Sequence, residues 1–195
     1  SRSDPASSQS LSALMDRLEG GLRLQVAQFC LASGILEHES ALGSAVYRVT
    51  ASNGALVALV DLRGEVGVLP TASPIAFEDA MWTPVPREAV SMPGHFTRCS
   101  LSQLMWQYAL HTARDVLPSR YRTERLYFRR PPRLPQRVLR DSHLLLLREL
   151  ATEPGRFTEL QQRTGLGDAQ MAQDLGALYL VGAVTCNPRR AAQLP

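Results

Sequence analysis

The sequence predicts an α+β fold, with an amino-terminal antiparallel-sheet domain and its covering helices followed by a helical carboxyl-terminal domain. Apolar and β-branched segments between residues 44 and 69 alternate with glycine-containing turns, as in a meander of short strands. Apolar residues recur at helical spacing near both ends of the chain. A proline- and arginine-rich stretch at residues 131–137 lies between the two patterns and is expected to be a stiff domain linker.

Length and composition are those of a globular protein. The 195 residues suffice for one large domain or two small ones, and 45% of them are apolar. The longest apolar runs, 55–60 and 144–147, are much shorter than the ~20 residues of a membrane-spanning helix, so no membrane insertion is expected. Cys30, Cys99 and Cys186 form no CxxC pair, which fits free thiols in a reducing cytoplasm.

Positive charge is concentrated in the middle of the chain and is carried by arginine alone. Residues 1–95 have a net charge of −4, residues 96–140 of +8 and residues 141–195 of −1. A guanidinium binds phosphate or carboxylate through two parallel hydrogen bonds, which makes the central stretch a candidate for anion recognition. A GC-rich genome is the alternative explanation of the arginine bias.

The first domain is expected at residues 11–130, after a disordered tail at residues 1–10. Helical spacing begins at Leu11, is interrupted by two glycines at 20–21, and resumes over about 22–34. These two helices are expected to cover a sheet.

Three antiparallel strands are expected next, at residues 45–50, 56–62 and 65–69. Asn53-Gly54 is the preferred two-residue hairpin turn, because both positions tolerate positive φ. The middle strand is apolar on both faces except at Asp61, so it should be covered on both sides.

The segment from Pro70 to Gly94 has five prolines, and a long irregular connection is expected there apart from a short helix considered around Ile75 to Met81. Trp82 lies in it, either as a ligand platform or as an anchor to the core. Residues 100–103 form a capping box that should begin a helix reaching about Leu117. Residues 125–130 then alternate as an edge strand with a cationic outer face.

The second domain is expected at residues 138–195. Its first helix is followed by a capping box at 158–161, by Gly165 as a left-handed helix end, by a third helix from Asp168, and by a strand at 183–186. This order, and the run T-G-L-(four residues)-M-(three)-L-(two)-L followed by G-x-V, resembles the winged-helix domain of bacterial transcription regulators.

The resemblance implies that the helix from Asp168 to Leu178 enters the DNA major groove. Its expected outward residues are Ala169, Gln170, Gln173, Asp174 and Ala177. Gln170 and Gln173 would contact bases. Phosphate contacts would come from Arg156, Arg163, Arg189 and Arg190, the last two in the wing. Winged helices also serve as protein adaptors, so DNA and a protein are both expected partners.

A second candidate surface is an arginine cluster between Arg114 and Arg140, with Tyr121, Tyr127 and Phe128 interleaved. Its expected anion-binding patch consists of Arg120, Arg122, Arg125, Arg129, Arg130, Arg133 and Arg137. Basic residues with aromatic residues suit nucleic acid, a phosphorylated nucleotide or an acidic protein partner. A solvated edge that pairs with the acidic first domain is the alternative.

No pattern in the sequence points to catalysis. Asp61 ends an apolar strand, as the phosphoacceptor of receiver domains does, but no acidic pair ends an earlier strand, so a cap on the turn at Gly64 is preferred. The four histidines lack metal-ligand spacing, and P-loop, GxGxxG and GxSxG patterns are absent. We therefore expect no enzyme, no bound metal and no cofactor.

The sequence thus predicts a non-enzymatic bacterial regulatory protein in the cytoplasm. In this interpretation a sensor or dimerisation domain, with a homodimer as one expected state, precedes a DNA-binding module for transcriptional regulation. The alternative is a protein adaptor or scaffold of a signalling or secretion system, which could also bind a phosphorylated nucleotide through its arginine cluster.

Overall fold

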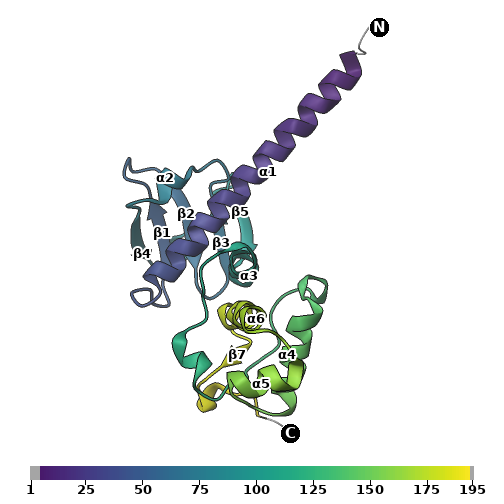
Figure 1. Ribbon diagram of the computed structural model, residues 1–195. Coiled ribbons are helices and arrows are strands. Elements are labelled where there is room, and N and C mark those ends of the chain that lie inside the picture. Colours follow the sequence, from purple (N-terminus) through teal and green to yellow (C-terminus); the bar gives the residue numbers. More distant parts are fainter. Residues whose placement is uncertain (1–4, 194–195) are drawn as a thin grey trace. The chain divides into compact units, whose positions relative to one another are not determined.

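The computed structural model describes residues 5–193, with side chains from residue 10 onwards. The chain divides into two compact units, an amino-terminal unit up to Leu101 and a carboxyl-terminal unit from Ser102. The first holds a five-stranded antiparallel sheet, and the second is mainly helical (Figure 1). The predicted α+β class is confirmed.

The amino-terminal unit begins with α1, one continuous helix over Pro5–His38. The predicted disordered tail is therefore wrong for residues 5–10, while residues 1–4 lie outside the described residues. The predicted interruption at residues 20–21 is also wrong. A glycine in a helix costs only ~1 kcal/mol relative to alanine, and good helix formers on both sides continue the helix through the pair.

The carboxyl-terminal half of α1 crosses one face of the sheet, whereas its amino-terminal half extends beyond the sheet (Figure 1). Ala27, Leu31 and Ile35 are buried on the sheet side of this helix. They recur every four residues and so form one stripe, which is the usual way in which a helix covers a sheet.

The sheet of the amino-terminal unit has the strand order β4-β1-β2-β3-β5, and every neighbouring pair is antiparallel. Its strands are β1 (Val46–Thr50), β2 (Leu56–Asp61), β3 (Glu65–Val68), β4 (Met81–Val85) and β5 (Thr97–Ser100). The predicted three-stranded meander is its centre, β1-β2-β3. The residues from Val57 to Val60 are all buried, in agreement with a covered central strand.

Both outer strands were missed by the sequence analysis. β4 lies in the segment from Pro70 to Gly94 that was expected to be irregular outside a short helix, and the helix present there is the single turn α2 (Pro74–Phe77). Pro84 within β4 faces Tyr47 of β1. Proline cannot donate to a neighbouring strand, so β4 can only be an edge strand, where one side needs no partner.

The turn between β1 and β2 is one residue longer than predicted. The N–H of Ala51 donates to the carbonyl of Ala55 at 2.8 Å, which leaves Ser52, Asn53 and Gly54 as a three-residue loop. Gly54 has φ +84°, the left-handed conformation that such a loop requires at its last position.

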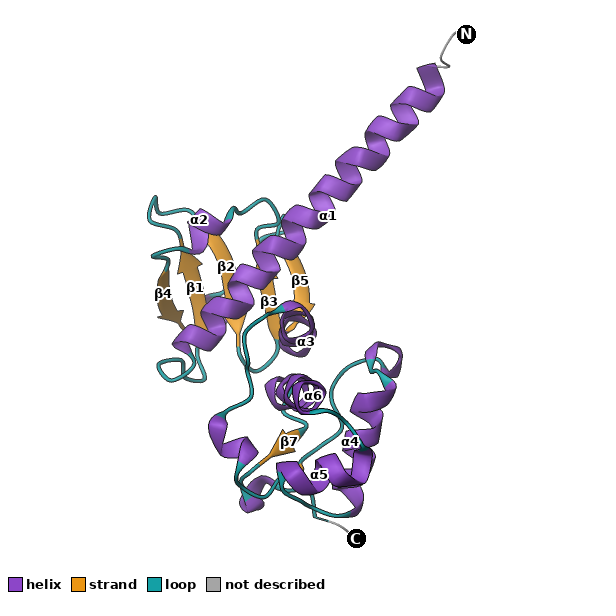
Figure 2. Ribbon diagram, viewed as in Figure 1, coloured by secondary structure: helices purple, strands orange, loops and turns teal. Residues whose placement is uncertain are grey.

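The carboxyl-terminal unit has four α-helices and two short paired strands among its described residues. They are α3 (Leu101–His111, of which Leu101 belongs to the first unit), β6 (Tyr127–Phe128), α4 (Asp141–Thr152), α5 (Phe157–Thr164), α6 (Asp168–Leu180) and β7 (Val184–Thr185). Three of the helices, α4, α5 and α6, lie around β7 (Figure 2). Single 3-10 turns lie at Ser119–Arg122, Gln136–Val138 and Pro188–Arg190.

The predicted domain boundary at residues 131–137 is wrong. Trp106, Leu117 and Leu126 precede that stretch, yet they belong to the same buried core as the leucines of α4, α5 and α6, and Leu134 within the stretch packs against this core. Residues 102–130 therefore form part of the carboxyl-terminal unit. No helix among the described residues is both long and apolar enough to cross a membrane.

Candidate interaction surface of the carboxyl-terminal unit

A three-residue turn joins α5 to α6. Gly165 ends α5 with φ +72°, as predicted, and Gly167 precedes the first residue of α6. The predicted capping box at 158–161 does not begin the helix, because α5 already starts at Phe157 with Arg156 as its N-cap.

The strand after α6 pairs with a segment that precedes the three helices. Phe128 of β6 faces Val184 of β7, and Leu126 forms a bridge with Gly155, between α4 and α5. β6 thus occupies the position beside β7 that the returning strand of a wing would take. Arg189 and Arg190 lie instead on the turn Pro188–Arg190, where Oδ1 of Asn187 accepts the N–H of Arg189 at 3.0 Å.

Gln170 and Asp174 are bound to each other on α6. The amide nitrogen of Gln170 donates to both carboxylate oxygens of Asp174, at 3.0 and 2.9 Å. Asp174 and Ala177 are fully buried, so their predicted outward positions are wrong. Asp174 lies three residues after Met171 and four before Leu178, within the apolar stripe of the helix, and this spacing indicates an inward position.

His143 of α4 completes a buried polar network with Asp174. Its Nδ1 accepts the backbone N–H of Arg140 at 3.0 Å, which leaves Nε2 as the nitrogen that carries a proton. Nε2 lies 3.1 Å from Oδ1 of Asp174, although the N–H is not aligned with that oxygen, and both side chains are 0% exposed. The ring of Trp106 covers the imidazole, with 4.6 Å between ring centroids.

The network keeps the Asp174 carboxylate charged. Burial by itself would raise the pKa of Asp174, but the nearby His143 ring and the polar groups of Gln170 and Ser142 favour the anion more strongly, and the pKa is lowered. The polar side chains on the inner face of α6 therefore serve its packing onto α4.

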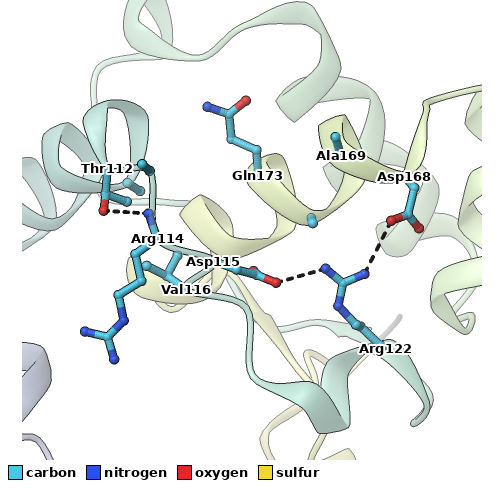
Figure 3. Close-up of a pocket in the computed structure, with 11 residues that line it drawn as sticks. Thr112, Arg114, Asp115, Val116, Arg122, Asp168, Ala169 and Gln173 are labelled. Carbon is cyan, nitrogen blue, oxygen red and sulfur yellow. Dashed lines mark hydrogen bonds and ion pairs between the residues drawn. The ribbon is translucent and has the colours of Figure 1, made fainter.

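The outer face of the first turns of α6 lines a cavity of about 340 Å³. Ala169, Ala172 and Gln173 form one wall, and the segment Thr112–Val116 forms the opposite wall (Figure 3). Arg122 closes one end, since its guanidinium lies 3.0 Å from a carboxylate oxygen of Asp115 and 3.7 Å from one of Asp168.

The Thr112–Val116 segment is held firmly against α6. Local turns order it, with the N–H of Leu117 donating to Oδ1 of Asp115 at 3.1 Å. A Cβ on Gly176 would lie 2.9 Å from Cγ2 of Val116, so the helix approaches this segment at a residue without a side chain. The helix that was predicted to reach about Leu117 ends at His111, so residues 112–116 are free to form this wall, and their position depends on tertiary packing.

The arginines divide into those with acidic partners and those without. Arg163 donates to the carbonyl of Glu153 at 3.0 Å and lies within 3.6 Å of the carboxylates of Glu153 and Glu159. Arg122 is paired as described above. The predicted roles of these two in binding a phosphate compete with these internal pairs.

Most other predicted anion-binding arginines have no acidic partner in the described part of the chain. Arg120, Arg125, Arg133, Arg137, Arg156, Arg189 and Arg190 are exposed, and Arg129 and Arg130 are half-buried. The carboxyl-terminal unit carries fourteen arginines and eight acidic residues, a net charge of +6. The amino-terminal unit has a net charge of −3.

Two of these guanidinium groups converge at Gly182. A Cβ built on this glycine would lie 2.7 Å from Nη2 of Arg130 and 3.4 Å from Nη1 of Arg129, so the two nitrogens are at most about 6 Å apart. Nε of Arg130 is buried without a hydrogen-bond partner. Burial first, and then the charges of Arg129 and Arg133, lower the pKa of Arg130. An anion placed among these groups would relieve both the repulsion and the unsatisfied donor.

Asp61 and Trp82 of the amino-terminal unit have structural roles. Oδ1 of Asp61 accepts the N–H of Arg63 at 2.9 Å, and its carboxylate pairs with Arg87, which confirms the turn-capping interpretation. Trp82 stacks on His38, with ring centroids 5.0 Å apart, and contacts α1 at Gly34. This placement fits the anchor role considered for Trp82.

Comparison with known proteins found no matching family model, no matching curated protein and no matching solved structure. Among the described residues, no cluster of three histidine, cysteine or acidic side chains could hold a metal ion.

Proposed function

We propose that this protein is a non-enzymatic regulatory adaptor whose carboxyl-terminal unit binds an acidic segment of a partner protein through its unpaired arginines. The observation that carries the proposal is the position of α6. Its outer face lines a walled cavity with the Thr112–Val116 segment opposite, and the amide of Gln170 is bound to Asp174. A helix that reads bases needs its outer face clear, because the major groove is only ~12 Å wide and the helix fills it.

The charge distribution supports an anionic partner. The unit carries +6, and its exposed arginines lie on several elements, from Arg120 to Arg190. Arginine pairs with carboxylates in a bidentate geometry, and a flexible acidic segment can adapt to guanidinium groups at different positions. A protein partner requires no base-reading helix, which agrees with the internal use of Gln170.

DNA-binding transcriptional regulation is the second candidate, and the resemblance of residues 138–195 to winged-helix domains favours it. In that case Gln173, the exposed glutamine of α6, would be the main base contact. The cavity wall would first have to move away from α6, and the breaking of the Arg122–Asp168 pair would accompany that movement.

Binding titrations separate the two candidates. The 195-residue chain is titrated by fluorescence anisotropy with a glutamate-rich peptide and with duplexes of two unrelated sequences. The adaptor predicts peptide binding that Arg133→Glu weakens by about tenfold or more, because a charge-assisted pair becomes a repulsive one. Arg63→Glu is the matched control, since Arg63 is an exposed arginine of the amino-terminal unit.

The titrations with DNA duplexes can contradict the adaptor proposal. Tight binding to one duplex and weak binding to the other, with no affinity for the peptide, would contradict the adaptor. Equal binding to both, with a log–log salt slope near −0.9 per phosphate contact, would indicate sequence-independent contacts by the arginines and would leave α6 without a reading role.

A further inference from the structure

The amino-terminal half of α1 carries an exposed apolar stripe. Leu11, Leu14, Met15, Leu18, Leu22 and Val26 are each between 44% and 62% exposed. Large apolar side chains that are exposed together, and not singly, usually mark a surface that another molecule covers.

The stripe lies on the side of α1 that faces away from the sheet. At about 100° per residue, Leu11, Leu18, Leu22 and Val26 fall within about 80° of one another around the helix. Ala27, Leu31 and Ile35, which are buried on the sheet side, are centred about 180° from them. The helix therefore has two apolar faces, and its own unit covers only one.

We propose that the outer stripe of α1 pairs with the same stripe of a second copy of this chain, so that the protein is a homodimer through α1. This inference is independent of the adaptor function. From residue 11 to residue 26 the stripe is about 22 Å long at ~1.5 Å per residue, which suits side-by-side helix packing. Along the stripe, the intervals between successive residues are 4, 3, 4 and 4 for Leu11, Met15, Leu18, Leu22 and Val26. These intervals are close to the 3.6-residue period of a straight helix, so the residues stay on one face along its length.

The area of the stripe is that of a stable dimer. If each of its six side chains exposes roughly 100 Å² of apolar surface, two copies bury about 1,200 Å² in total. Stable protein interfaces start at about this size.

Charge favours a protein surface over a lipid surface. The polar side of this half of α1 carries Asp16, Arg17, Glu19 and Arg23, which sum to zero. Helices that lie on anionic membranes carry an excess of Lys and Arg on their polar face. With both signs present, two copies of α1 do not repel each other.

A pair of matched double variants tests the proposal on the 195-residue chain. Leu11→Glu with Leu18→Glu places two charges in the stripe. Ala13→Glu with Gly20→Glu is the control, since both residues are exposed, are also seven positions apart, and lie on the opposite side of the helix. No atom lies within 4 Å of a Cβ built on Gly20.

Analytical ultracentrifugation at about 50 µM, a concentration at which dimers with micromolar or lower Kd predominate, gives the molecular mass. We expect the wild type and the control at twice 21.5 kDa and the stripe variant at 21.5 kDa. Because four buried leucines are replaced in each dimer, its Kd should rise by about 1,000-fold or more. Fluorescence of Trp82 and Trp106, one in each unit, verifies that the variants remain folded.

Three results would overturn the proposal. They are a monomeric wild type, a stripe variant that dimerises as tightly as the wild type, and a control that is monomeric. A monomeric wild type that cosediments with phosphatidylcholine vesicles would assign the stripe to lipid instead.

Discussion

Replacement of Asp174 by alanine tests the buried network between α4 and α6. The carboxylate of Asp174 accepts from Gln170 at 2.9 and 3.0 Å and lies 3.1 Å from Nε2 of His143. Alanine removes the acceptor of Gln170 and the charged neighbour of His143, and each buried polar group that loses its partner costs about 1–3 kcal/mol. We expect Asp174→Ala to lower the free energy of unfolding by about 4 kcal/mol, a large part of the 5–15 kcal/mol typical of a domain.

Urea unfolding measures this loss. Trp106 is the reporter, because its ring centroid lies 4.6 Å from that of His143. Asp168→Ala is the control on the same helix. Its carboxylate is 74% exposed and lies 3.7 Å from Arg122, so its loss should cost less than about 1 kcal/mol. His143→Leu combined with Asp174→Leu removes donor and acceptor together and should recover most of the stability.

The pH dependence gives an independent check. Because the folded pKa of Asp174 is lowered, its carboxylate contributes stability above the unfolded value of ~3.9, and this contribution is lost as the pH falls through the folded pKa. The difference between wild type and Asp174→Ala should be constant from about pH 7 to pH 5 and shrink below about pH 4. An Asp174→Ala variant within 1 kcal/mol of wild type at pH 7 would refute the reasoning.

Three further predictions concern other parts of the fold. Gly182→Ala should destabilise the protein by about 1–2 kcal/mol in urea unfolding, because φ is +73° and the new Cβ would meet Arg130, and an unchanged midpoint would contradict this. Asp61→Ala should cost about 1–2 kcal/mol in thermal unfolding, since it removes the cap on Arg63 and the Arg87 pair, and no loss would count against the turn-capping role. Burial first, and then the charge of Glu65, raise the pKa of Cys99 to about 11. In a variant with the other two cysteines replaced by serine, alkylation of Cys99 at pH 8 should therefore be about 100-fold slower than that of a free thiol. Rapid alkylation would refute the burial of this thiol.

Local patterns in the sequence were sufficient for most of the elements that form by local rules. The meander β1-β2-β3, the left-handed end of α5 at Gly165 and the start of α6 at Asp168 each depend on neighbouring residues. β4 and β5 could not be predicted in this way, because they are held by pairing with β1 and β3 across the sheet and lack a strong alternation of their own.

The domain boundary was misplaced for a similar reason. Residues 131–137 have the composition of a linker, but composition does not reveal that Leu126 before this stretch and Leu134 within it pack into one core. Only the three-dimensional contacts of Trp106 and Leu117 assign residues 102–130 to the second unit.

The candidate site was predictable only in part. The arginine patch could be identified from its charge, and the structure leaves most of it without acidic partners. The inward position of Asp174 was also readable, because it lies on the same stripe as Met171, Leu175 and Leu178. The wall opposite α6 was not, since the position of Val116 beside Gly176 depends on packing between segments sixty residues apart.

The central claim is that α6 does not read DNA sequence. Repeated selection of a pool of random 20-base-pair duplexes on the 195-residue chain tests it most directly. The adaptor predicts that the selected duplexes share no consensus and that Gln173→Ala leaves their composition unchanged. A consensus half-site that disappears in Gln173→Ala would contradict the account and would place α6 in the major groove.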